Sequence, residues 1–313
     1  MSKFIYLDQN KWIDLARSLK GKDSKFDKVR ELIEEKVKND EWIFPISIIH
    51  IIETSSRLDD RTRNDLVDTF EMFYNNYSIL PYIYCEMFEI DNILKNLMKL
   101  ETIDLNEVVI QNNSLNSVGL KQNPKYDSYF SETIKNNLNI IEKISFINIL
   151  RKKIDINELN EIEKDNLEYK SGLETIRDKI NKYPKQYAYQ IFLVESFFER
   201  FSKSLVLFAN KHNLKKEAYD TLINFNDQKC VLGFLESCSS FHAKTSLIYS
   251  ISKDQYRDID KNDFKDIAAL STALPYCDVV VTEKLWWHHV KSQKLDEKYN
   301  SIIFRDLNSL LNL

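Results

Sequence analysis

Glycine and proline are scarce in this sequence. It has only 4 glycines and 5 prolines among 313 residues, whereas an average chain has roughly 7% glycine and 5% proline. The glycines stand alone at Gly21, Gly119, Gly172 and Gly233. Walker-type and dinucleotide-type phosphate loops need closely spaced glycines, so the sequence excludes both. The scarcity also disfavours all-β architectures with many tight turns, and we predict a mostly helical chain.

Paired cysteines and long apolar runs are also lacking. None of the 4 cysteines forms a CxxC pair, which excludes zinc-ribbon and thioredoxin-like sites. The apolar run near the N-terminus is too short for a signal peptide. The longest apolar stretch, residues 43–52, contains Pro45, Ser47 and His50 and is too short to span a bilayer. We therefore expect a cytoplasmic protein with no membrane partner.

The charge balance is near neutral for a chain of this size. The formal net charge is -4, with 43% hydrophobic and 29% charged residues, as in a soluble globular protein. The chain is no polycation, so any binding of nucleic acid must depend on local patches or metal ions.

Strand-like segments are found near the two ends of the chain. Residues 4–7, 42–44, 278–282 and 302–304 are short apolar runs, and amphipathic helical patterns lie between them. Alternating strands and helices are typical of an α/β fold with a parallel sheet.

The middle of the chain has helical periodicity and few strand signals. We therefore predict that residues 1–59 and 259–313 form one α/β core and that residues 60–258 are a large all-α insertion. Within it, the charged segment 155–183 predicts an exposed helical hairpin or a short coiled coil. The insertion is also the surface on which we expect a protein partner.

Carboxylates occur where a parallel sheet presents its ligands, at the carboxyl ends of the strands. Asp8 follows the first strand, Glu53 lies on the helix after the second, and Glu283 follows the third. Asp266, with Asp263 one turn earlier, begins the helix before the third strand. An acid at a strand end or a helix start is also an ordinary helix cap.

Glu53 is the carboxylate that capping explains least well. It follows the apolar run 48–52, and a buried carboxylate without a partner is costly. A hard divalent cation held by several carboxylate oxygens, Mg²⁺ or Mn²⁺, would remove that cost.

Three motifs resemble those of the PIN-domain nucleases. Residues 6–13 (YLDQNKWI) resemble the opening strand of that family, with its catalytic Asp and a polar Asn two positions later. Residues 45–47 (PIS) leading to Glu53 resemble the second acidic motif, and residues 266–269 (DIAA) with 279–283 (VVVTE) resemble the third motif and the strand after it. The resemblance covers about the first sixty and last sixty residues.

This resemblance implies a PIN-like core and a metal-dependent endoribonuclease, a class that includes toxin–antitoxin ribonucleases and RNA-processing enzymes. It implies that the catalytic carboxylates are Asp8, Glu53, Asp266 and Glu283, holding Mg²⁺ or Mn²⁺, with Asp263 as an alternative to Asp266. Many family members carry a fourth acid where this chain has Lys284, so Glu283 either replaces that acid or the fourth carboxylate is absent.

Other residues near these motifs are candidates for supporting roles. Asn10, Ser47 and Thr282 could orient a carboxylate or a water molecule, although each is equally suited to capping or turn formation. The mixed basic and aromatic segment that follows Glu283 could bind a single strand by stacking and charge; its candidates are Lys284, Trp287 and His288.

We therefore predict an endoribonuclease that cleaves single-stranded RNA, with a role as a toxin or defence effector and an antitoxin or other protein partner. Two alternatives stay open at this point: a structure-specific DNA nuclease of the same fold, and a catalytically inactive helical binding protein.

Overall fold

A computed structural model of the chain describes residues 2–112, 146–212, 220 and 228–313. These residues divide into two compact units, which are described separately. Unit 1 comprises Met1–Pro81, Val109–Asp165 and Ala273–Leu313, and unit 2 comprises Tyr82–Val108 and Asn166–Thr272. The sequence also predicts a long loop at residues 112–125, and all of it except residue 112 lies outside the described residues. Among the described residues, no helix combines the length and apolar character that crossing a membrane requires.

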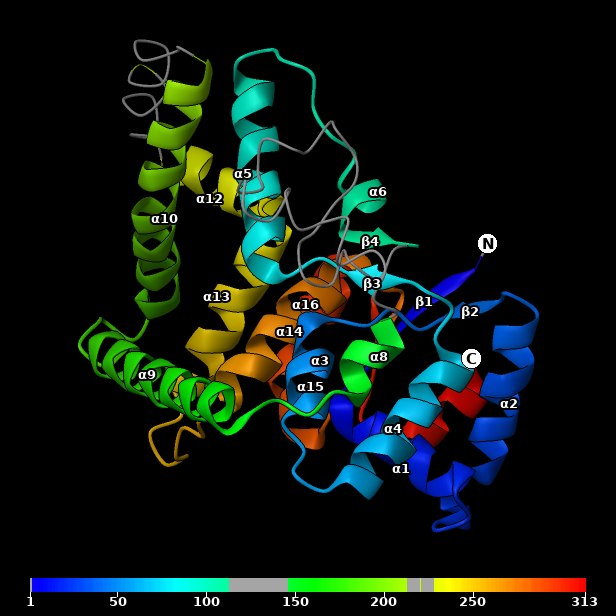
Figure 1. Ribbon diagram of the computed structural model, residues 1–313. Helices are drawn as coiled ribbons and strands as arrows, with labels where there is room; N and C mark the ends of the chain where they lie inside the picture. The colour runs from blue at the N-terminus through cyan, green and yellow to red at the C-terminus, as the bar shows by residue number, and fades with distance from the viewer. Residues whose placement is uncertain (1, 113–145, 213–219, 221–227) are drawn as a thin grey trace. The chain divides into compact units, whose positions relative to one another are not determined.

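A four-stranded parallel sheet is the centre of unit 1 (Figure 1). The strand order is β2-β1-β5-β6, and all three neighbouring pairs are parallel, as predicted. The strands are β1 (Lys3–Leu7), β2 (Trp42–Ile43), β5 (Val279–Val281) and β6 (Ile302–Phe304). An antiparallel pair that the sequence did not predict is formed by β3 (Ser78–Ile79) and β4 (Ile110–Gln111).

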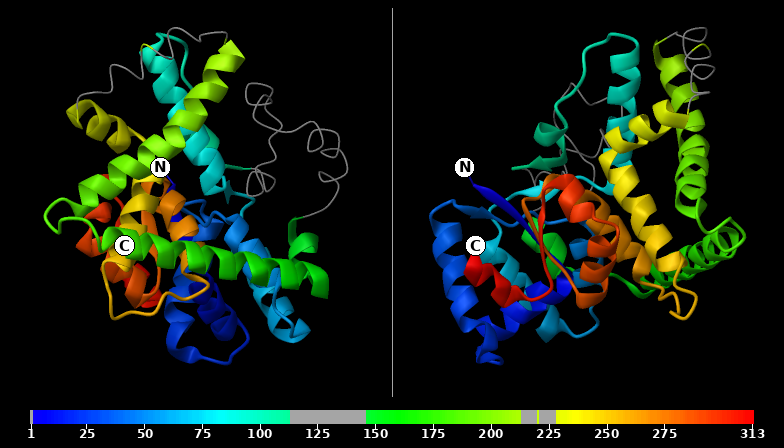
Figure 2. Two further views of the ribbon diagram at one scale, coloured as in Figure 1. Left: turned by 90° about the vertical axis from the view of Figure 1, so that its left-hand side faces the viewer. Right: turned by 180° about the vertical axis from the view of Figure 1, so that it is seen from behind.

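Helices surround this sheet. They are α1 (Gln9–Leu19), η1 (Ser24–Phe26), α2 (Asp27–Lys38), α3 (Ile48–Ser55), α4 (Asp60–Phe73), α8 (Phe146–Arg151), α15 (Lys284–Ser292), α16 (Leu295–Tyr299) and η4 (Leu307–Asn312). Figure 2 shows η4, near the C-terminus, beside α2, and the two elements are in contact. The two ends of the chain therefore contribute to one unit.

The central strands are buried on both faces, which explains their continuous apolar sequence. Ile5 and Leu7 of β1, and Val279 and Val281 of β5, belong to one core cluster with residues of α1, α2 and α4. Val280, which points to the opposite face, is fully buried as well.

The boundaries of unit 1 differ from the predicted division at residues 59 and 60. Leu66, Phe70 and Phe73 of α4 are buried in the same core as the strands, because the apolar face of this helix packs on α1. At the other end, residues 259–272 belong to unit 2 rather than to the core. Sequence periodicity gives the apolar face of a helix but does not give the element on which that face packs.

Unit 2 is helical. Its elements are α5 (Tyr82–Leu97), most of α6 (Leu105–Val109), the later part of α9 (Ile156–Ile180), α10 (Ala188–His212), α12 (Gln228–Ser237), α13 (Ser239–Ser252) and the first part of α14 (Asp263–Tyr276). Its core cluster lies between α5, α10, α12 and α13 and includes Phe197, Phe201 and Phe234. The predicted hairpin at residues 155–183 is wrong, because α9 is one continuous helix to Ile180.

Candidate functional site

The strand order of unit 1 defines a topological switch point. From β1 the chain passes to β2 on one side, and it later returns to the other side of β1 as β5. Leu7, the last residue of β1, is in register with Val281, the last residue of β5. In open α/β sheets, the crevice outside the carboxyl ends of the strands at such a point is the usual place for a ligand.

Asp8 lies at this point and is held by both strands. Its backbone N–H donates to the carbonyl of Val281 (2.9 Å), so it continues the β1–β5 ladder. Its side chain caps α1, with Oδ1 accepting the N–H of Gln9 (2.7 Å). Oδ2 accepts the hydroxyl of Thr282 (3.1 Å), which is fully buried. These contacts hold the carboxylate in a single orientation.

Glu283 provides a second carboxylate at the same edge. It is half-buried at the N-cap position of α15, and its Oε1 accepts a hydrogen bond from the side-chain amide of Asn10. Burial of Asp8, and next the charge of Glu283, raise the pKa of Asp8 from 3.8 to about 6. Asp8, Asn10, Thr282 and Glu283, all predicted from the sequence, are thus brought together at the switch point.

His50 supports this edge from inside the core. The ring is fully buried, and burial lowers its pKa to about 4, so it is neutral. Nε2–H donates to the carbonyl of Leu7 (2.8 Å), and Nδ1 accepts the backbone N–H of Ser47 (3.0 Å). The tautomer follows because a carbonyl can only accept. His50 therefore ties the start of α3 to the residue before Asp8.

Ser47 caps α3 together with His50. Capping, the alternative to a role in orienting a carboxylate or water, therefore accounts for the contacts of Ser47. Its hydroxyl lies 3.2 Å from Nδ1 of His50. Glu53 is half-buried on the same helix, and its charge acts on Arg57, one turn later.

Asp263 and Asp266 lie in the first turn of α14, in unit 2. Both oxygens of Asp263 are bound by the guanidinium group of Arg257, at 2.8 Å and 2.5 Å, and one also accepts the N–H of Asp260 (2.8 Å). These bonds occupy the carboxylate and close the loop before α14. Asp266 is half-buried.

The three residues predicted to bind substrate lie on α15. Lys284 and His288 are exposed, and Trp287 is half-buried. The guanidinium carbon of Arg305 lies 5.6 Å from the centre of the Trp287 ring. This cation–π contact was not predicted from the sequence, because Arg305 belongs to a segment beyond β6.

Gln9 is a second residue whose role the sequence did not indicate. It is buried between α1 and α3, and its Nε2 donates to the hydroxyl of Thr54 (3.0 Å). Its Oε1 is buried without a hydrogen-bond partner. One feature of the sequence could have indicated that Gln9 is buried: it is a polar residue at the first position of a helix whose inner face is apolar.

No group of three or more His, Cys, Asp or Glu side chains lies close enough to hold a metal ion within the parts of the chain that the structure describes. Comparisons of the chain with models of known protein families, with curated proteins and with solved structures found no match.

We expect the Asp8→Asn variant to be more stable than the wild type at pH 7 in EDTA. The pKa of Asp8 is higher in the folded protein than the ordinary 3.8, so this group favours folding at low pH, and its contribution is lost as pH rises from about 4 to about 6. Removing the charge recovers at most about 3 kcal/mol, and less where water screens the half-buried group. Urea unfolding measures the change, and a less stable variant would contradict the assignment.

His50 has the opposite pH dependence. Its folded pKa is about 4, below the ordinary 6.5, so the stability that it contributes is complete above pH 6.5 and is lost as pH falls toward 4. The loss amounts to about 3 kcal/mol. Urea unfolding at several pH values measures this loss. We expect the free energy of unfolding of His50→Gln to fall less than that of the wild type as pH is lowered from 6.5 to 4. His288→Gln, at an exposed histidine, is expected to behave as the wild type does. The same loss of unfolding free energy at low pH in both variants would contradict this.

Proposed function

We propose that this protein is a metal-dependent endoribonuclease, that unit 1 is PIN-like, and that the edge carrying Asp8 and Glu283 is its active site. The observation that carries the proposal is the pair of carboxylates at the topological switch point. Each is held by a hydrogen bond from a neighbouring side chain, Thr282 or Asn10. The resemblance of residues 6–13 and 279–283 to PIN motifs supports the same conclusion.

The donor atoms at this edge fit Mg²⁺ or Mn²⁺. Both are hard cations that prefer carboxylate oxygens. Mg²⁺ is usually held by one or two protein carboxylates and completes its coordination with water and substrate phosphates, so two carboxylates are a sufficient protein set. Burial and then the charge of Glu283 raise the pKa of Asp8, and a divalent cation would offset the repulsion between the two carboxylates.

In this proposal Asp8 and Glu283 are the two protein carboxylates that hold the ion. A bound divalent ion activates water as a nucleophile and neutralises charge on the phosphate oxygens. Thr282 and the N–H of Gln9 keep both oxygens of Asp8 oriented, which lowers the cost of reorganisation during the reaction. Without the ion, the two carboxylates would repel the phosphates of the substrate.

The direct test incubates the protein with labelled single-stranded RNA and DNA in Mn²⁺, in Mg²⁺ or in EDTA. We expect RNA to be cleaved with either metal and to stay intact in EDTA. Preferential cleavage of DNA would replace the proposal with a DNA nuclease of the same fold. Intact RNA and DNA under all conditions would contradict the proposal and favour a binding protein.

A further inference from the structure

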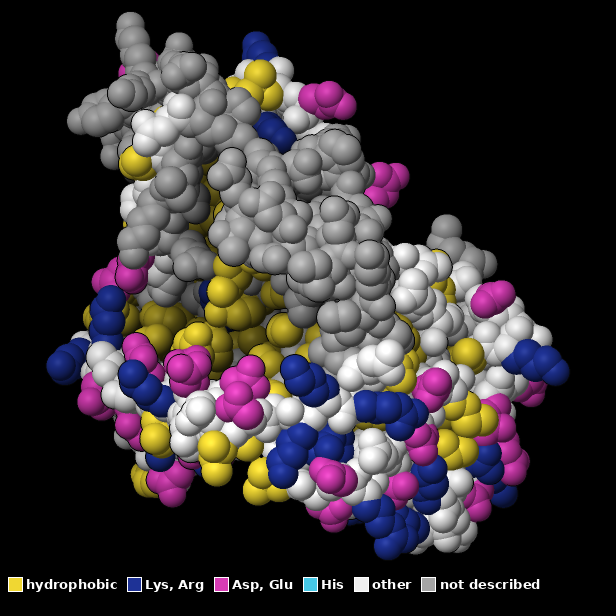
Figure 3. Space-filling model, in the orientation of Figure 1, with side chains coloured by type: hydrophobic (Ala, Val, Ile, Leu, Met, Phe, Trp, Pro, Cys, Tyr) yellow, Lys and Arg dark blue, Asp and Glu magenta, His cyan; other side chains and the backbone are white. Residues whose placement is uncertain are grey.

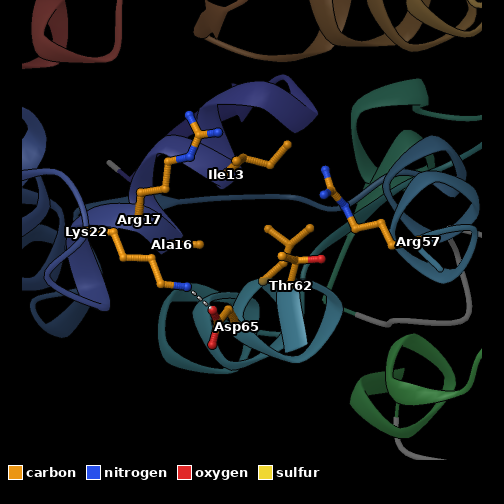
Figure 4. A pocket seen from close by; sticks show the side chains of 8 residues that line it. Ile13, Ala16, Arg17, Lys22, Arg57, Thr62 and Asp65 are labelled. Carbon is orange, nitrogen blue, oxygen red and sulfur yellow. Dashed lines mark hydrogen bonds and ion pairs between the residues drawn. The ribbon is translucent and has the colours of Figure 1, made fainter. Parts of the chain in front are cut away.

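A pocket of about 200 Å³ lies in unit 1, between α1, α4 and the segment that follows α3 (Figure 4). Ile13 and Ala16 of α1 and Leu66 of α4 give it an apolar wall. Four of the other five lining side chains are charged, so charged groups border a mainly apolar pocket.

Three cationic side chains from separate parts of the chain line this pocket: Arg17 on α1, Lys22 in the loop after α1, and Arg57 just beyond α3. Figure 4 shows the two arginines on opposite sides of it. One lining carboxylate, Asp65, pairs with Lys22 at 2.6 Å. The carboxylate near Arg17 is Asp14, at 3.9 Å, and Arg17 is 59% exposed, so this pair contributes little.

Arg57 has the least complete set of partners. Its Nε atom is buried without a hydrogen-bond partner. Burial is the largest influence on its pKa and lowers it, and the nearby charge of Arg17 acts in the same direction. The charge of Glu53 raises the pKa of Arg57, but by less than burial and Arg17 together lower it. A partly buried guanidinium charge is costly, and an anionic ligand beside the group would lower that cost.

On the face drawn in Figure 3, the Lys and Arg side chains of unit 1 are interspersed with Asp and Glu. A broad basic surface would attract any polyanion, whereas cationic groups gathered in a small concave site favour one compact anion.

We propose that this pocket binds the phosphate group of a nucleotide, either free or within a strand, with Arg17 and Arg57 donating to its oxygens. A guanidinium group matches phosphate geometry with two parallel N–H donors, and the non-bridging oxygens of a phosphate, which a monoester and a diester both have, can accept from two arginines. The volume beside the apolar wall accepts the sugar or base that carries the phosphate. Arg17 follows Asp8 by nine residues on α1, on the order of 13 Å along the helix axis, so the pocket is distinct from the carboxylate edge.

The test is isothermal titration calorimetry in EDTA, which removes any contribution from divalent ions and from cleavage. The ligands are inorganic phosphate, a nucleoside 5′-monophosphate, and an oligonucleotide without terminal phosphates. We expect the wild type to bind inorganic phosphate saturably at millimolar concentration. Tighter binding of the monophosphate would identify a free nucleotide as the ligand, and tighter binding of the oligonucleotide would identify a strand; either supports the proposal.

Two variants and a control locate the binding site. Arg57→Gln and Arg17→Gln are each expected to weaken phosphate binding by at least about tenfold, the order for loss of a charge-assisted hydrogen bond. Arg61→Gln, at an exposed arginine on α4 that does not line the pocket, is expected to bind as the wild type does. Arg17 is exposed, so its replacement leaves the fold intact.

The proposal is overturned if the wild type shows no saturable phosphate binding, or if Arg57→Gln and Arg17→Gln bind phosphate as tightly as Arg61→Gln. Because binding is measured without metal, this result is independent of whether the protein cleaves RNA.

Discussion

The Asp8→Asn variant is expected to lose metal-dependent RNA cleavage by about 10²- to 10³-fold, the order for removal of one group that stabilises charge in a transition state. Asn keeps the size of the side chain: its Oδ1 can still cap α1, and its amide N–H can donate to the hydroxyl of Thr282 in place of the bond that Asp8 accepts. The change therefore removes the charge that we propose holds the ion, while the side chain can still be positioned by its neighbours.

Asp14→Asn is the matched control. Asp14 lies on the same helix, α1, and forms its ion pair with Arg17. We expect this variant to cleave RNA at the wild-type rate. Cleavage rates are measured at several Mn²⁺ concentrations. Equal cleavage by wild type and Asp8→Asn at every concentration would contradict the assignment of the active site.

The Phe70→Ala variant is expected to lose about 3–5 kcal/mol of unfolding free energy, the usual cost of truncating a buried aromatic side chain. Phe70 is fully buried, and its ring centre lies 4.6 Å from that of Trp12 on α1. It also packs on His50, at 6.0 Å, so a cavity here would loosen the residue that supports the end of β1.

Met72→Ala is the control for this prediction, because Met72 lies on the same helix and is 46% exposed. We expect it to change the unfolding free energy by less than about 0.5 kcal/mol. Urea unfolding of the full chain gives the change in unfolding free energy for both variants. Equal effects of the two substitutions would show that α4 is not part of the core and would restore the predicted boundary at residue 59.

The sheet and its edge could be predicted from the sequence because the signals are local. Four short apolar runs, each followed by a helical pattern, indicate parallel strands, and the register of Leu7 with Val281 brings the residues that follow them together. Asp8, Thr282 and Glu283 directly follow those strand ends. Their proximity therefore depends only on β1 and β5 being neighbours.

The remaining features depend on contacts between distant residues. Nothing in the sequence indicates that Arg257 occupies the carboxylate of Asp263, or that His50 donates to the carbonyl of Leu7. His50 lies in an apolar run, which indicates burial but does not indicate its hydrogen-bond partner. The same limit applies to α4 and to the pocket around Arg57, where three elements have to meet before the charges share one site.

The central claim is that Asp8 and Glu283 hold a divalent cation, and titration of the protein with Mn²⁺, followed by electron paramagnetic resonance of the free ion, tests it most directly. The wild type is expected to bind Mn²⁺, and Asp8→Asn and Glu283→Gln are each expected to bind it at least about tenfold more weakly. Asp14→Asn is expected to bind as the wild type does. Equal Mn²⁺ affinity in all four proteins, or no binding by the wild type, would contradict the claim.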